Sequence, residues 1–88
     1  MKPTFLELRH LRTLLALKET GSVSMAAKHV YLTQSALSHQ IKLMEEQFGL
    51  PLFERKSNPL RFTAAGDRLI RLANEILPKV VDAERELA

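Results

Sequence analysis

The sequence predicts a mainly α-helical fold, in which three helices and a small β-hairpin precede one long helix. Three observations support this prediction. Apolar residues recur at spacings of three and four in the segments expected to be helical. A serine or threonine stands where the later helices should begin. Two short strand-like runs, LFERK and LRFT, flank the turn-forming segment 57–59. The 88 residues allow one small domain, or one domain with an appended helix.

The first two helices are expected on either side of a glycine. Leucines at helical spacing predict an amphipathic helix over residues 6–19, and Gly21 suits its C-terminal end. Ser24 precedes the run MAAKHV, so we expect it to cap a second, short helix. Tyr31 and Leu32 then form a brief link.

The third helix and the hairpin complete a recognisable pattern. Thr33 is expected to cap a helix over 34–47, which Gly49 and Pro51 end. Two short helices joined by a tight turn form a helix-turn-helix, here about residues 23–42. A hairpin at about 52–63 makes it winged. We therefore predict a winged helix-turn-helix domain over residues 5–63.

Residues 64–88 are predicted to form a linker helix that mediates dimerisation, with Thr63 as its cap. Its apolar residues follow a helical seam over nearly three heptads: Leu69, Leu72, Ile76, Val80, Ala83 and Leu87. Either the first three helices or a second chain must cover this seam, and its length favours a second chain. Pro78 lies in its middle, so we expect either a kink near 74–78 or a break after Leu77.

The third helix is expected to present one polar face. At about 100° per residue, Leu37, Ile41 and Met44 share a core-facing side. The other side carries Gln34, Ser35, Ser38, His39 and Lys42. Amides and hydroxyls can read base edges, small Ala36 can approach a thymine methyl group, and Lys42 suits phosphate. Any exposed helix can show such a face, but the first half of this one carries no acid, which favours nucleic acid.

Composition and charge limit the other possibilities. Lysine and arginine outnumber the acids by 13 to 10, and the basic excess lies ahead of an acidic tail. Basic Arg55, Lys56 and Arg61 flank the hairpin turn, where they can reach phosphates or a minor groove, or simply protect a strand edge. Phe53 and Phe62 are expected in the core.

Several classes of site and location are excluded or disfavoured. The absence of cysteine excludes disulfides and thiolate metal sites, and the three histidines do not form a metal cluster. No apolar run is long enough to span a membrane, and no signal peptide is evident. We therefore expect a cytoplasmic protein.

The residues also carry a family resemblance. Over about Leu6–Gly66, the stretch AAKHVYLTQSALSHQIKLMEEQFGLPLFERKSNPLRFTAAG resembles the amino-terminal DNA-binding domain of LysR-type transcriptional regulators. The resemblance rests on five features of this stretch: the paired alanines, TQSALSHQI, the Phe-Gly end of the third helix, LFER, and the final Arg-Phe-Thr-x-x-Gly. It implies a bacterial transcription factor whose third helix enters the major groove of double-stranded DNA.

The resemblance assigns roles to individual residues. It implies groove contacts by Gln34, Ser35, Ser38 and His39, and wing contacts by Arg55 and its neighbours. Thr33 begins the reading helix, and Ser22 and Ser24 lie where the family touches phosphate. The family commonly has proline at Ser35 and arginine at His39, so the second difference removes a long, charged reader.

The resemblance also implies partners. The family dimerises through its linker helices, forms higher oligomers when intact, and binds interrupted, AT-rich inverted repeats near the nucleoid. It carries a larger domain that binds a small-molecule effector; the 88 residues have no room for it, so we expect a fragment that itself needs no cofactor or metal.

Two rival functions stand beside DNA binding. An enzyme could pair Ser35 or Ser38 with His39, but no acid, oxyanion hole or pocket is evident, so we expect none. A protein-interaction module would use the apolar seam instead of the basic face. Replacing Arg55 and Lys56 by alanine would leave such an interaction intact but weaken DNA binding and reduce its salt dependence.

Overall fold

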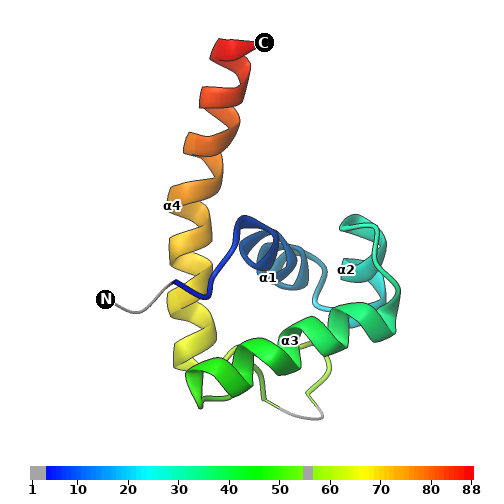
Figure 1. The fold of residues 1–88 in the computed structure, drawn as a ribbon. Coiled ribbons are helices and arrows are strands. Elements are labelled where there is room, and N and C mark those ends of the chain that lie inside the picture. Colours follow the sequence, from blue (N-terminus) through cyan, green and yellow to red (C-terminus); the bar gives the residue numbers. More distant parts are fainter. Residues whose placement is uncertain (1–3, 55–56) are drawn as a thin grey trace.

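The computed structural model describes residues 4–54 and 57–88. The described chain contains four helices, which are α1 (Leu8–Thr20), α2 (Val23–His29), α3 (Gln34–Phe48) and α4 (Ala64–Leu87). The first three pack together, and α4 rises from them with the C-terminus at its far end (Figure 1). The mainly helical fold is thus confirmed.

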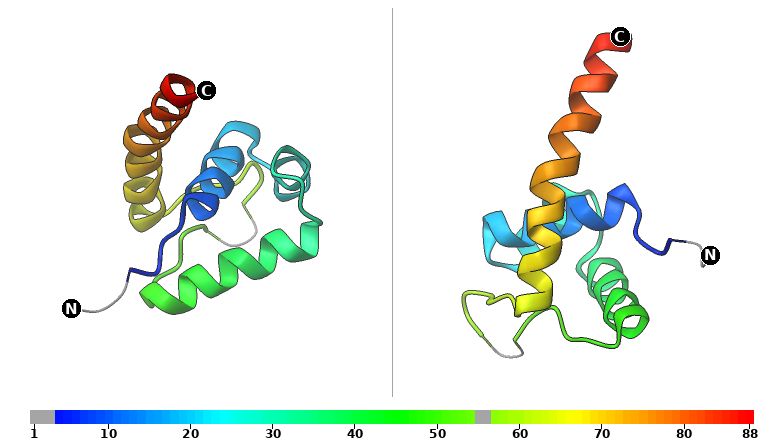
Figure 2. Two further views of the ribbon diagram at one scale, coloured as in Figure 1. Left: turned by 45° about the horizontal axis from the view of Figure 1, so that its top comes forward. Right: turned by 90° about the vertical axis from the view of Figure 1, so that its left-hand side faces the viewer.

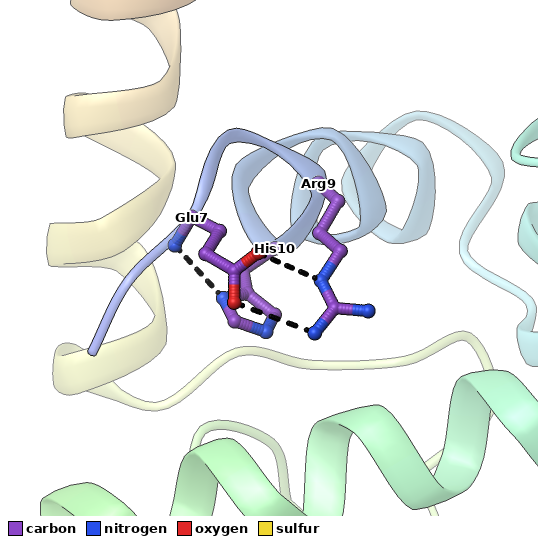
Figure 3. Close-up of polar contacts among 3 residues, drawn as sticks. All are labelled: Glu7, Arg9 and His10. Atoms are coloured by element: carbon purple, nitrogen blue, oxygen red, sulfur yellow. Dashed lines mark hydrogen bonds and ion pairs between the residues drawn. The ribbon is translucent and has the colours of Figure 1, made fainter.

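The start of α1 is held by a buried histidine that the sequence did not single out. The backbone N–H of Glu7 donates to Nδ1 of His10 at 2.9 Å, as Figure 3 shows. The His10 ring stacks on Phe5 with 5.0 Å between centroids. Burial lowers the pKa of His10, and the positive charge of nearby Arg9 lowers it further. The negative charge of Glu7 acts in the opposite direction and raises the pKa.

The second helix is capped two residues earlier than expected. The cap is Ser22 rather than Ser24, because the residue before the helix must be extended and its oxygen must face a free N–H. Ser22 has φ −144° and ψ 132°, and its hydroxyl accepts from Met25 N at 3.3 Å. Ser24 lies inside α2 with its Oγ 3.1 Å from that of Ser22.

The third helix follows the prediction closely. The Thr33 hydroxyl accepts from Ala36 N at 3.0 Å, and Gly49 follows the last residue with φ 66°. Leu37, Ile41 and Met44 are buried, as their shared face predicts. Because these bonds and contacts satisfy both ends and one side of α3, its remaining surface is available for other roles.

The predicted hairpin is reduced to one antiparallel bridge between Phe53 and Phe62, and the described residues include no longer strand pair. The bridge is flanked by the bonds Glu54 N to Arg61 O and Thr63 N to Leu52 O. Nearer the turn, backbone N–H groups donate to partners other than the facing segment. The N–H of Leu60 donates to Gly21 O, and that of Arg61 donates to the Ser57 hydroxyl. Because these N–H groups are already bonded, they cannot extend the antiparallel pairing beyond the single bridge.

Two hydrophobic clusters hold the elements together. The larger joins α1, α2 and α3 to the base of the bridge, with Leu14, Leu17, Leu37, Met44 and Leu52 almost fully buried. Phe53 and Phe62 pack against it, which confirms their expected place. The smaller cluster joins α1 to α4.

The long helix α4 begins as predicted, because the Thr63 hydroxyl accepts from Gly66 N at 3.2 Å. It continues through Pro78, so the break after Leu77 is wrong. Figure 2 also shows one uninterrupted helix from two sides. The described part of the chain contains no helix long and apolar enough to cross a membrane.

In the described part of the chain, the buried residues of α4 all lie between Gly66 and Leu77. Its buried residues Ile70, Ala73 and Leu77 lie beside the predicted seam, and the last two contact Leu11 of α1. Of the seam itself, Leu69, Leu72 and Ile76 are partly buried against the two clusters. Val80 belongs to neither cluster, and Ala83 and Leu87 are exposed. The first three helices therefore cover the near half of the seam.

Candidate nucleic-acid interface

The polar face of α3 is open to solvent. Its exposed residues include all five predicted base-reading residues and the predicted phosphate contact Lys42: Gln34, Ser35, Ala36, Ser38, His39 and Lys42. The structure thus brings these six residues together on one rigid helix. Thr33, at the helix start, is exposed as well, although its hydroxyl already serves as the cap. Donors, acceptors and one cation are presented without a covering element, which is the arrangement that groove recognition requires.

The bridge region lies at the same end of the molecule as α3, opposite the C-terminus (Figures 1 and 2). Arg61 is exposed there, and its backbone is tied to Glu54 on the facing segment at 2.9 Å. The rings of Phe53 and Phe62 meet edge to face with 4.8 Å between centroids. This packing and the backbone bond fix the position of the Arg61 backbone. Arg55 and Lys56, also predicted here, lie outside the described residues.

The start of α2 adds two hydroxyls. Ser24 is exposed and Ser22 is partly buried, and their oxygens lie 3.1 Å apart. Ser22 also accepts from Met25 N, so its oxygen is already used as a cap. Ser24 is therefore the more available of the two for a ligand.

Glu45, near the C-terminal end of α3, has a structural role that the sequence analysis did not predict. Glu45 Oε2 accepts from Leu52 N at 2.7 Å and thereby ties the end of α3 to the bridge region. Beside it an open cleft of about 750 Å³ is lined by residues including Lys42, Glu46, Phe53 and Glu54. Neither the apolar periodicity nor a motif signals this bond, because its partner is a backbone N–H beyond the helix.

The same surface offers little for catalysis. Ser35, Ser38 and His39 line neither this cleft nor a second one near the α2–α3 turn. Within residues 4–54 and 57–88, no three histidine, aspartate or glutamate side chains gather as metal ligands. What the exposed face can do chemically is donate and accept hydrogen bonds and offer positive charge.

Comparison with known protein families identifies the chain's family. Residues 8–67 match the family described as bacterial regulatory helix-turn-helix protein, lysR family. The chain is also 88% identical over all its 88 residues to the HTH-type transcriptional regulator MetR of Haemophilus influenzae. It is 50% identical over 78 residues to MetR of Escherichia coli K12. Within the chain, the segments TQSALSHQ and RKSNPLRFT resemble MetR in particular, and these identities confirm that narrower resemblance.

Solved structures agree with the sequence relatives. The chain matches the BenM DBD in its complex with benA site 1 DNA at a TM-score of 0.85 and 35% identity, covering 93% of this chain and 92% of that one. It matches the CbnR DBD in its DNA complex at a TM-score of 0.79 and 28% identity, covering 92% and 93%. The chain spans about a quarter of the length of the MetR relatives, 28% and 25% for the two named above.

Proposed function

The chain belongs to the lysR family of bacterial regulatory helix-turn-helix proteins, and from this premise we propose that it binds double-stranded DNA by sequence. The observation that carries the proposal is the exposed polar face of α3. In it, residues able to pair with base edges lie together on one helix whose other side is locked into the core.

Each residue of the face has a proposed part. Gln34 can pair with adenine N6 and N7, the two serines can donate or accept, and Ala36 can lie near a thymine methyl group. His39, at the far side of the face, stands where the family commonly has the longer side chain of arginine. Lys42 and the start of the helix at Thr33 contact phosphates and set the register.

Flanking contacts complete the proposed footprint. The segment 52–63 acts as the wing, with Arg61, Arg55 and Lys56 reaching a phosphate or the minor groove. Ser22 and Ser24 contact phosphate from α2. Support comes from the exposure of Arg61 and Ser24 at surfaces that flank α3.

We further propose that the chain consists of two structural units and that two copies of it form a dimer. Residues 5–63 are the reading domain, and residues 64–88 are a linker helix through which two copies pair. Support comes from the far half of the α4 seam, where Val80 and Leu87 contact neither hydrophobic cluster. Two copies related by symmetry would read an interrupted, AT-rich inverted repeat.

The intact protein would be a transcription factor rather than an enzyme. The MetR relatives are named as transcriptional regulators, and this chain spans about a quarter of their length. A domain beyond the linker helix would bind a small-molecule effector and support higher oligomers. We place the protein in the cytoplasm with the nucleoid.

The proposal is tested by fluorescence anisotropy of the chain on a labelled AT-rich inverted-repeat duplex and on a scrambled duplex of equal composition. Tighter binding to the repeat, falling steeply as salt increases, is the expected result. Equal affinity for both duplexes would contradict base reading. Absence of binding at low salt would favour the rival interaction module, which would use the α4 seam.

A further inference from the structure

A cleft lies beside the turn between α2 and α3, and the proposed DNA contacts do not use it. We call it the turn cleft. It has a volume of about 330 Å³, and its lining includes Arg9, Arg12, His29, Tyr31, Leu32 and Gln40. These residues come from α1, from the end of α2 and its turn, and from the middle of α3.

Tyr31 at the rim of the turn cleft has an unusual conformation. The helix α2 ends in a Schellman motif, in which Leu32 N bonds to Ala27 O at 2.9 Å and Tyr31 N bonds to Lys28 O at 3.3 Å. Tyr31 holds the left-handed position of this motif with φ 57°, where glycine is favoured. Its side chain is nevertheless 95% exposed. A strained, solvated aromatic residue contributes little to folding, which points to an external role.

Gln40, on α3, leaves a hydrogen bond unmet in the turn cleft. Its Oε1 is buried and has no partner among the described residues. A buried amide oxygen without a partner costs free energy, and rotation of the Gln40 side chain toward a donor in the cleft would recover it. The missing partner is therefore an N–H or an O–H group.

The charge of the turn cleft is positive. Arg9 is paired with Glu7 through Nε at 3.2 Å, and that pair is largely exposed. Arg12 is exposed and forms no ion pair within the described residues. The imidazole ring of His29 also lines the cleft. Among the described residues that line the cleft none is acidic, so Arg12 offers it a free cation that suits a carboxylate-bearing partner.

The turn cleft is separate from the proposed reading face. On α3, Gln40 is two residues beyond Ser38, about 200° around the helix. A partner in the turn cleft would thus leave Ser38 and its neighbours uncovered. The proposed reading of DNA and occupation of the cleft can then occur together.

We propose that the turn cleft binds an acidic segment of another protein. A carboxylate of the segment pairs with Arg12, a backbone N–H donates to Gln40 Oε1 once that side chain rotates toward the cleft, and an apolar side chain packs on the Tyr31 ring. Tyrosine and arginine are the residues most often found at the energetic centres of such interfaces. A protein segment is favoured over a small acid because only a larger partner would cover Tyr31.

The test uses the 88-residue chain and a fluorescein-labelled peptide, Gly-Asp-Glu-Leu-Asp-Glu-Leu-Gly, followed by anisotropy at low salt. Arg12→Gln should weaken peptide binding about fivefold, the scale of one exposed charge pair. Arg68→Gln, the same change on exposed α4, should leave it unchanged. Equal affinity of both variants, or equal affinity for a peptide with Asn and Gln in place of the acids, would overturn the proposal.

A second variant separates binding from folding. Tyr31→Gly should leave the melting temperature unchanged or raise it, because glycine accepts φ 57° without strain, and it should lower the affinity for the peptide. Binding to the inverted repeat should not change in either variant. If Arg12→Gln or Tyr31→Gly weakened DNA binding and left peptide binding intact, the turn cleft would be a nucleic-acid contact and the proposal would be wrong.

Discussion

At the scale of single residues, chemically similar side chains take different roles according to their neighbours. The hydroxyls of Ser22, Thr33 and Thr63 accept bonds from the first turns of three helices. The hydroxyls of Ser35 and Ser38, on the open side of α3, face solvent. Position relative to a helix start decides which hydroxyl is structural and which can meet a ligand.

The buried histidine predicts a pH dependence of stability. Because burial lowers the folded-state pKa of His10 below 6.5, the unfolded chain binds the proton more readily. The contribution of neutral His10 is full above pH 6.5 and is lost as the pH falls through the folded-state pKa. Protonation also removes the Nδ1 acceptor of the Glu7 N–H.

Urea unfolding between pH 8 and pH 5 measures this effect. The free energy of unfolding should fall below pH 6.5 with a slope of at most about 1.4 kcal/mol per pH unit from this group. The slope should be shallower in His10→Gln and unchanged in the control His29→Gln, whose side chain is exposed. An equal slope in His10→Gln would show that other groups cause the dependence.

Base reading is also a single-residue property. Gln34→Ala should remove a bidentate contact and cost about 1–3 kcal/mol on the preferred duplex, with relaxed preference at one base pair. Competition anisotropy on duplexes that vary one position at a time measures both quantities. Lys42→Ala is the control, because loss of a phosphate contact should weaken all duplexes alike and reduce the salt slope. Equal losses on every duplex for Gln34→Ala would contradict its role.

At the scale of elements, specific bonds hold the bridge region against the helices. Glu45 at the end of α3 binds Leu52 N, the Thr63 hydroxyl donates to Pro51 O at 2.7 Å, and Leu60 N reaches Gly21 O at 3.2 Å. The ammonium of Lys18 on α1 lies 5.6 Å from the centroid of the Phe62 ring. A segment with only one bridge thus keeps a defined place beside the reading helix.

The junction of α4 with this segment predicts a sensitive glycine. A Cβ at Gly66 would collide with the backbone oxygen of Leu52 and lie 2.9 Å from Cδ2 of Phe62. The backbone oxygen cannot move aside as a flexible side chain could. Gly66→Ala should therefore destabilise the chain by about 1–3 kcal/mol, as overpacking does.

Thermal unfolding followed by circular dichroism measures the loss. Gly49→Ala serves as the comparison, because a Cβ there meets no atom within 4 Å and only the strain of φ 66° remains. We expect the melting temperature to drop further in Gly66→Ala. A smaller drop there than in Gly49→Ala would show that the junction rearranges easily.

At the scale of the whole molecule, α4 projects away from the other helices. At about 1.5 Å per residue its 24 residues span about 36 Å, and the longest dimension of the molecule is 42 Å. Its near half packs on α1, whereas Leu87, the last residue of the seam, is 90% exposed at its far end. Exposed apolar residues on a projecting helix support the proposed pairing of two chains.

The proposed pairing can be tested without disturbing either cluster. Val80→Asp places a charge in the far half of the seam, and sedimentation should show a change from twice 10.0 kDa to 10.0 kDa. Val81→Asp, one residue further and about 100° around the helix, is the matched control and should remain paired. A wild-type chain that sediments as a monomer at every concentration would contradict pairing through α4 alone.

Much of the fold follows from local sequence. Thr33 and Thr63 begin their helices, Gly21 and Gly49 end theirs, and the 3.6-residue period places Leu37 in the core. The period likewise groups the proposed reading residues on one exposed face. These properties depend on backbone groups and neighbours within one or two turns, so a linear pattern contains them.

Other features depend on residues far apart in the chain. Burial of His10, coverage of Leu72 by α1, the Glu45 bond to Leu52 and the unmet Gln40 oxygen all require distant elements to meet. Local pattern does not specify these encounters, because burial and pairing are set by the packing of whole helices. The sequence therefore defined the helices and their polar face, and tertiary packing decided which side chains remained free to bind.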